Sequence, residues 1–123
     1  MNGNSLLLDT NIVLYLLGGD KTLVPILENK KLIISFITEL EMLSYKLFRE
    51  TERLQIKRFL KECIIVDVNS SIKEYAIDIR KKYSLKLPDC IIAATAKQLK
   101  VPLISADKEF SKVDDMEIIF YQK

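Results

Sequence analysis

The chain has 123 residues, of which 49% are apolar and 29% charged, with a formal net charge of +2. This length suffices for the core of one domain, which we place over residues 1–123, and the charge is too small to identify nucleic acid as a partner. No apolar run approaches the ~20 residues of a membrane span, and the N-terminus lacks the basic segment of a signal peptide, so we expect a cytoplasmic protein that does not enter a membrane. Histidine is absent, which excludes Ser-His-Asp and Cys-His catalysis.

Short apolar runs alternate with segments of helical spacing along the chain. The predicted strands are Ser5–Asp9, Leu32–Ser35, Ile64–Val68, Pro102–Ser105 and Glu117–Tyr121. These runs are continuously apolar, and strands of that kind have both faces covered. The sequence therefore predicts the α/β class, as a three-layer α/β/α sandwich with a mostly parallel central sheet.

Capping residues and glycines indicate where the helices between these strands begin and end. In chain order, we predict helices from Thr10 to a stop at Gly18-Gly19, from an Asp20 cap to about Glu28, from Thr38 to about Arg49, from a Thr51 cap through Leu60, from a Ser70 or Ser71 cap through Tyr83, and from Pro88 to about Lys100. Ser71 and Glu74 have the spacing of a capping box, and Pro88 suits a first helical turn.

Two cysteines, Cys63 and Cys90, lie in apolar runs. Two are too few for a disulfide framework or a zinc site, so both are predicted to be buried free thiols.

Four acids are predicted at one edge of the sheet. Asp9 ends the first strand, Asp107 follows the fourth by two residues, and Asp89 and Glu41 lie in the early turns of helices. Ligands of parallel α/β sheets bind at the carboxyl ends of the strands, near the point where the strand order reverses. Singly, each acid has an ordinary explanation as a helix cap, a favourable charge at a helix N-terminus, a turn residue or an exposed helix residue. Together they repel one another, which a divalent cation would offset, and oxygen ligands of this kind suit Mg²⁺ or Mn²⁺.

Polar neighbours accompany these acids. Thr10 and Asn11 follow Asp9, and Ser105 precedes Asp107 by two residues, so their side chains can orient the carboxylates. A separate set of cations falls three or four residues apart: Lys46, Arg49, Arg53, Lys57 and Lys61. They would form one basic helix face, either simply solvated or in contact with RNA phosphates or an acidic partner.

Four segments carry a family resemblance. LLLDTNIVLYLL, ISFITELEML, LKLPDCIIAATA and PLISADKEF resemble, in order and spacing, the PIN-domain nucleases, and among them the VapC-type toxins of prokaryotic toxin–antitoxin pairs. Any one of these motifs is weak, but four in order across nearly the whole chain are specific.

The resemblance implies a Mg²⁺- or Mn²⁺-dependent endoribonuclease with RNA as its substrate. It places the catalytic, metal-binding acids at Asp9, Glu41, Asp89 and Asp107, with Asp9 and Asp89 as principal ligands. Thr10, Asn11 and Ser105 match its supporting polar positions. The serine of ISFIT sets the register that selects Glu41 over Glu39, and Asp114 or Asp115 would be a peripheral acid. The resemblance also implies a homodimer and an antitoxin partner.

Three alternative kinds of protein would each carry a different set of acids. A PIN-fold module that binds RNA or protein without cutting it would have lost an acid, and none of the four is missing. A response-regulator receiver would carry adjacent acids after its first strand, and a haloacid-dehalogenase-type phosphatase would carry an acid where Asn11 stands. A nuclease is favoured, and toxin and housekeeping roles both remain open.

Overall fold

The computed structural model describes residues 4–122 of the chain. Its strands are β1 (Ser5–Leu8), β2 (Lys31–Ser35), β3 (Ile64–Val66), β4 (Leu103–Ser105) and β5 (Ile118–Phe120). Its helices are α1 (Thr10–Leu17), α2 (Leu23–Leu27), α3 (Phe36–Ser44), α4 (Glu50–Glu62), α5 (Ser70–Lys82) and α6 (Leu87–Leu99), and a 3₁₀ helix, η1 (Lys108–Lys112), follows β4.

The strands form one five-stranded sheet in the order β3-β2-β1-β4-β5. All four pairings are parallel, and Leu8 of β1 lies in register with Ile104 of β4. The strand order reverses between β1 and β4, because the chain builds outward from β1 through β2 and β3 and then returns to the other side. The predicted parallel sheet is therefore confirmed, and its switch point lies between β1 and β4.

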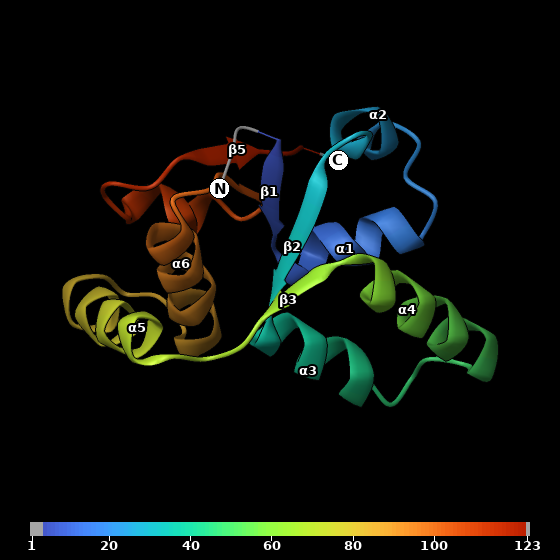
Figure 1. Ribbon diagram of the computed structural model, residues 1–123, viewed down its shortest axis with the longest axis horizontal. Coiled ribbons are helices and arrows are strands. Elements are labelled where there is room, and N and C mark those ends of the chain that lie inside the picture. Colours follow the sequence, from blue (N-terminus) through green and yellow to red (C-terminus); the bar gives the residue numbers. More distant parts are fainter. Residues whose placement is uncertain (1–3, 123) are drawn as a thin grey trace.

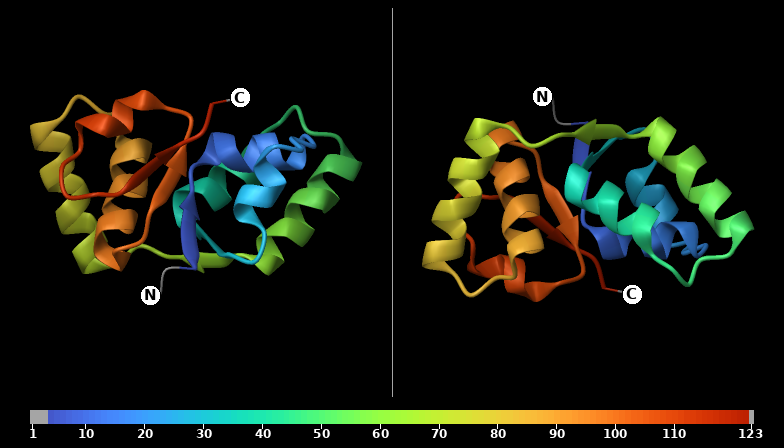
Figure 2. Two further views of the ribbon diagram at one scale, coloured as in Figure 1. Left: turned by 90° about the horizontal axis from the view of Figure 1, so that it is seen from above. Right: turned by 90° about the horizontal axis from the view of Figure 1, so that it is seen from below.

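Helices cover both faces of this sheet, as Figures 1 and 2 show from three directions. Neighbouring residues of β1 point to opposite faces: Leu7 joins the core beneath α5 and α6, whereas Leu6 and Leu8 join the core beneath α1 and α4. Ile33 and Ile34 of β2 divide in the same way. The predicted three-layer sandwich is confirmed, with one apolar core on each side of the sheet.

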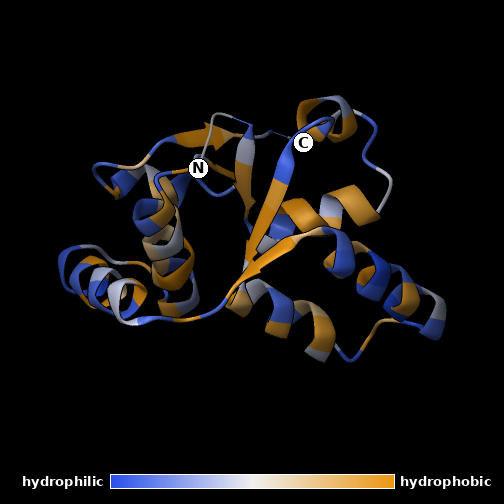
Figure 3. Cartoon of the chain, in the orientation of Figure 1, coloured by the Kyte–Doolittle hydropathy of each residue, from blue (hydrophilic) through white to orange (hydrophobic). Residues whose placement is uncertain are grey.

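Burial falls from the centre of the sheet to its edges. Every residue of β1 and β4 is buried, whereas the edge strands β3 and β5 are partly exposed. Figure 3 shows largely apolar strands, and hydrophilic residues are most numerous on α4. Among the helices of residues 4–122, none is both long and apolar enough to cross a bilayer.

The helix predicted from Thr38 to Arg49 was wrong at both ends. It begins at Phe36, because the Ser35 hydroxyl accepts a hydrogen bond from the Ile37 N–H at 3.1 Å and caps the helix there. It ends at Ser44, and the chain continues as an extended loop in which the rings of Tyr45 and Phe48 lie 4.7 Å apart. Leu47, which continued the apolar pattern, is 80% exposed.

Three predicted caps were also displaced. Helix α4 begins at Glu50 rather than after Thr51, and the Arg49 N–H donates to the Glu52 carboxylate at 2.8 Å. Helix α5 is capped by Asn69 rather than Ser70 or Ser71, so Ser71 and Glu74 form no capping box. Helix α2 spans only Leu23–Leu27, although Asp20 accepts hydrogen bonds from the N–H groups of Thr22 and Leu23 at its start.

The predicted basic face is shorter than the charge spacing suggested. Lys46 lies in the loop before α4 and Arg49 is its N-cap, so only Arg53, Lys57 and Lys61 share a helical face. Both cysteines are free, as predicted, but only Cys90 is buried. Cys63 is half-buried, and that partial burial raises the pKa of its thiol to about 11.

Candidate active site

The switch point brings Asp9 and Ser105 side by side. Asp9 directly follows β1, Ser105 ends β4, and the Asp9 N–H donates to the Ile104 carbonyl at 3.1 Å. The Ser105 hydroxyl donates to Asp9 Oδ2 at 2.7 Å. The parallel ladder itself therefore fixes the relative positions of an acid and a hydroxyl that are 96 residues apart in sequence.

Asp9 is a buried carboxylate, with only 5% of its surface exposed. Its other oxygen, Oδ1, accepts the N–H of Thr10 at 2.8 Å, and Asp9 is the N-cap of α1. Burial raises the pKa of this carboxyl, the hydrogen bonds from Ser105 and Thr10 oppose that rise, and the charges of Asp107 and Glu41 add to it. Asp9 thus caps a helix as the sequence allowed, and it also belongs to an acidic cluster.

Glu41 reaches this cluster through Thr10. The Thr10 hydroxyl donates to Glu41 Oε1 at 2.7 Å, while the Thr10 backbone N–H is held by Asp9. Glu41 lies in the second turn of α3, the helix that leaves the carboxyl end of β2 beside β1. Of the two glutamates considered from the sequence, Glu41 is therefore the one that contacts a neighbour of Asp9, while Glu39 lies in the first turn of α3.

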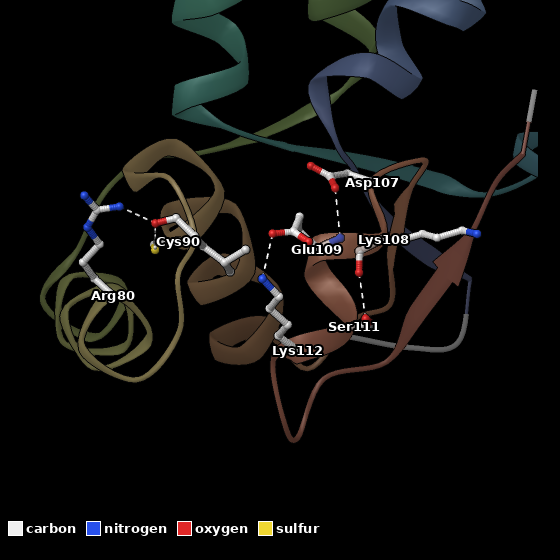
Figure 4. Close-up of polar contacts among 8 residues, drawn as sticks. Arg80, Cys90, Asp107, Lys108, Glu109, Ser111 and Lys112 are labelled. Carbon is white, nitrogen blue, oxygen red and sulfur yellow. Dashed lines mark hydrogen bonds and ion pairs between the residues drawn. The ribbon is translucent and has the colours of Figure 1, made fainter.

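Asp107 approaches from the loop after β4. Its N–H donates to Ser105 Oγ at 2.9 Å, and its Oδ1 accepts the N–H of Glu109 at 2.9 Å as the N-cap of η1 (Figure 4). Phe110, fully buried in the core under α6, anchors this short helix. Ser105 therefore contacts both Asp9 and Asp107, and it fixes the spacing between them.

Asp89 completes the cluster from α6. It lies half-buried in the first turn, directly after Pro88. Burial is the main cause that raises its pKa to about 6, followed by the charges of Asp9 and Asp107, with a smaller contribution from Glu41. Lys86 lowers the pKa, but not enough to cancel the others. Four acids from four separate segments thus influence one another electrostatically, and we call Asp9, Glu41, Asp89 and Asp107 the acidic cluster.

The chemistry of the acidic cluster fits a hard divalent cation. Its donors are carboxylate oxygens supported by hydroxyls, which suit Mg²⁺ or Mn²⁺ better than zinc. Within residues 4–122, no three acid or thiol side chains stand close enough to form a preassembled metal site. Mutual repulsion of the carboxylates is consistent with this spacing, since a cation would have to draw them inward.

The remaining predicted polar residues differ in their surroundings. Asn11 lies exposed in the first turn of α1, and its supporting role stays a prediction. Asp114 and Asp115 are exposed in the turn between η1 and β5. The sequence reasoning missed Thr38, whose hydroxyl lies 3.0 Å from that of Thr10. Its place three residues before Glu41, on the same side of α3, was the signal that could have found it.

A parallel α/β sandwich with acids gathered at its switch point defines a class of small domains whose site lies at the carboxyl ends of the strands. The comparisons with known proteins make the assignment specific. The family model of the PIN domain matches residues 6–116. The chain belongs to the PIN-domain family.

A relative of similar sequence supports this membership, and solved structures share the fold. The chain is 33% identical to the ribonuclease VapC2 of Methanocaldococcus jannaschii, over 97% of this chain and 95% of that protein. Its fold is similar to VapBC2 from Rickettsia felis bound to a DNA fragment from its promoter, with a TM-score of 0.85, 21% identity and coverage of 96% and 99% of the two chains. It is also similar to a toxin–antitoxin complex from Klebsiella pneumoniae, with a TM-score of 0.79, 30% identity and coverage of 93% and 95%.

The raised pKa of Asp89 predicts a pH-dependent stability of the metal-free protein. Because the folded pKa of about 6 exceeds the ordinary 3.8, the folded state holds this proton more tightly, and the free energy of unfolding should fall as pH rises from about 4 to about 6. At pH 7.5, Asp89→Asn should stabilise the protein by about 1 kcal/mol, a figure reduced for solvent screening of a half-exposed group. Urea titrations of both proteins at several pH values measure this.

The control for this prediction is Asp78→Asn. Asp78 is an exposed aspartate on α5 that forms a 3.2 Å ion pair with Lys82, away from the acidic cluster. Its replacement should give no gain in stability at pH 7.5. Equal gains from both variants would show that loss of negative charge in general, rather than relief at Asp89, is responsible.

Proposed function

We propose that this protein is a Mg²⁺- or Mn²⁺-dependent endoribonuclease and the toxin of a toxin–antitoxin pair. The observation that carries the proposal is the acidic cluster at the switch point between β1 and β4, built from Asp9, Glu41, Asp89 and Asp107. It occurs in a PIN-domain chain whose relative over nearly its full length is named a ribonuclease.

Each acid of the cluster has its own role in such a metal site. Asp9 and Asp89 are the principal ligands, because both are drawn partly out of water and gain from a nearby positive charge. Asp107 and Glu41 flank them, held by Ser105 and Thr10 respectively. A divalent cation bound there would promote attack of water on a phosphodiester and offset the negative charge that develops during cleavage. A bound cation would thus supply the activation of water for which this sequence has no histidine base.

Two sets of exposed side chains on and beside α4 are available to RNA and protein partners. Exposed Arg53, Lys57 and Lys61 on α4 supply positive charge for RNA phosphates, and such contacts would weaken with salt. A groove lined by Leu14, Phe48 and Ile56 lies between α1 and α4. Exposed leucines on and between the neighbouring helices are Leu40, Leu43, Leu47 and Leu54.

Exposed apolar side chains of this kind favour a protein partner. The neighbour from Klebsiella pneumoniae is a toxin–antitoxin complex, which supports an antitoxin as that partner. We also propose a homodimer, in a cytoplasmic setting, and light scattering of the purified protein tests the oligomeric state.

The proposal is tested first by Mn²⁺ calorimetry on the wild type and on Asp89→Asn. Saturable binding by the wild type, weakened at least about tenfold in the variant, is the expected result, since one principal ligand is lost. The same proteins are then incubated with Mn²⁺ and a synthetic single-stranded RNA library, and cleavage is read by sequencing. Binding and cleavage that survive Asp89→Asn would contradict the assignment, and a wild type that does neither would favour a non-catalytic PIN-fold module.

A further inference from the structure

Thr38 is a buried polar residue beside the acidic cluster. It lies in the first turn of α3 with none of its surface exposed, and its Oγ1 is 3.0 Å from Oγ1 of Thr10. A threonine inside a helix commonly donates to the carbonyl four residues earlier. For Thr38 that residue is Ile34, which belongs to β2 and precedes the helix cap at Ser35. The Thr38 hydroxyl is directed across to α1 instead.

The direction of this hydroxyl contact follows from counting protons. A threonine hydroxyl has one proton to donate, and a carboxylate oxygen can only accept. Thr10 Oγ1 lies 2.7 Å from Glu41 Oε1, so its proton is committed to Glu41. The 3.0 Å contact between the two hydroxyls must therefore be a hydrogen bond that Thr38 donates to Thr10.

The result is a one-way chain of hydrogen bonds that ends on a member of the acidic cluster. Thr38 donates to Thr10, and Thr10 donates to Glu41, while the Thr10 backbone N–H is held by Asp9. Each bond in such a chain polarises and strengthens the next.

These hydrogen bonds matter because the Glu41 side chain could otherwise rotate away from the acidic cluster. Its side chain is exposed, and it faces the like charges of Asp9 and Asp89. Repulsion favours rotation of this carboxylate into solvent. A Thr10 hydroxyl whose direction is fixed by Thr38 holds Oε1 beside the other acids, where a cation could use it.

We propose that Thr38 is a positioning residue of the metal site: it donates to Thr10 and thereby holds the Glu41 carboxylate in place for Mg²⁺ or Mn²⁺. This inference rests on the proposed metal-dependent function. It assigns a role to a residue that touches neither metal nor substrate.

Two substitutions separate positioning from packing. Thr38→Val keeps the side-chain volume and removes the donor, whereas Thr38→Ser keeps the donor and removes a methyl group. If Thr38 positions Glu41, calorimetry should give a Mn²⁺ dissociation constant raised about tenfold for Thr38→Val and close to the wild-type value for Thr38→Ser. If Thr38 only packs, the order is reversed, and the proposal is overturned.

A matched control is available on α6. Thr95 is also fully buried, and its hydroxyl donates to the Ile91 carbonyl at 2.8 Å within its own helix. Thr95→Val makes the same chemical change away from Glu41, and it should leave Mn²⁺ affinity unchanged. A loss of affinity equal to that of Thr38→Val would overturn the proposal, because any buried threonine would then have the same effect.

A double-mutant cycle tests whether Thr38 acts through Thr10. In a Thr10→Val background, Thr38→Val should weaken Mn²⁺ binding no further, and in urea unfolding of the metal-free proteins the two substitutions should be less than additive. Full additivity in urea would overturn the hydrogen-bond chain whether or not metal binds. A wild type that binds no Mn²⁺, with coupling in urea intact, would instead overturn the metal site and with it the proposed function.

Discussion

Asp9→Asn is expected to reduce cleavage of RNA about a thousandfold while the protein stays folded. A bound cation contributes several kcal/mol to stabilising the charge of the transition state, which corresponds to roughly 10³ in rate. Asn keeps the shape of the side chain and can still accept the Thr10 N–H, which in the wild type lies 2.8 Å from Asp9 Oδ1. The measurement is the initial rate of cleavage of the RNA library at saturating Mn²⁺, with circular dichroism to verify folding.

A pair of substitutions on α3 tests whether membership of the acidic cluster, rather than loss of charge in general, slows cleavage. Glu39→Gln and Glu41→Gln make the same change two residues apart, but only Glu41 accepts a hydrogen bond from Thr10. Glu41→Gln should slow cleavage and Glu39→Gln should not. Equal effects of the two would mean that net charge near α3, rather than the acidic cluster, governs the rate. Full activity of Asp9→Asn would remove Asp9 from the site.

The sheet was predictable from the sequence because its strands are short apolar runs with sharp ends. LLL before Asp9 and LIS before Ala106 are buried on both faces, so their pattern has few alternatives. Helix ends were harder to predict. Leu47 and Phe48 continue the apolar spacing of α3, yet α3 ends at Ser44. The prediction ran too far because apolar spacing alone does not distinguish a helix from a loop that packs on the core, as Phe48 does. Asn69 caps α5 in preference to the serines that follow it.

The acids of the site were predictable for a different reason. Each lies just after a strand or in the first two turns of a helix, and parallel topology brings such positions to one edge. Their hydroxyl partners depend on side-chain directions that sequence spacing does not give. Ser105 was expected beside Asp107, and its 2.7 Å hydrogen bond to Asp9 requires the register of β1 on β4. Thr38 contacts Thr10 because β1 and β2 pair with Leu7 opposite Ile33, so that α1 and α3 begin the same number of residues beyond that pair.

The acidic cluster lowers the stability of the metal-free protein, and the same residues form the proposed metal site. Burial and mutual repulsion raise the pKa values of Asp9 and Asp89, so their charged forms disfavour the folded state at neutral pH. A cation that binds only the folded state would reverse this, by about 2.7 kcal/mol at a hundred times its dissociation constant. The same carboxylates thus destabilise the empty site and stabilise the loaded one.

Ser105→Ala is the stability prediction with the largest expected effect. Ser105 is fully buried, donates to Asp9 Oδ2 at 2.7 Å and accepts the Asp107 N–H at 2.9 Å. Alanine would leave a buried carboxylate oxygen without its donor and a backbone N–H without its acceptor, which should cost about 2–3 kcal/mol in the free energy of unfolding at pH 7.5. Urea titration of the metal-free proteins measures this loss.

The pH dependence of that loss identifies its cause. The hydrogen bond from Ser105 favours the charged form of Asp9 and lowers its pKa, so its removal should raise that pKa further. The destabilisation should therefore shrink as the pH falls towards the pKa of Asp9, where protonation removes the unpaired charge. Ser111→Ala is the matched control, because Ser111 is exposed on η1 and its hydroxyl donates only to the Lys108 carbonyl at 2.7 Å (Figure 4). A loss that is independent of pH would assign the effect of Ser105 to packing and to its hydrogen bond with the Asp107 N–H, and it would separate the buried charge of Asp9 from the stability of the site.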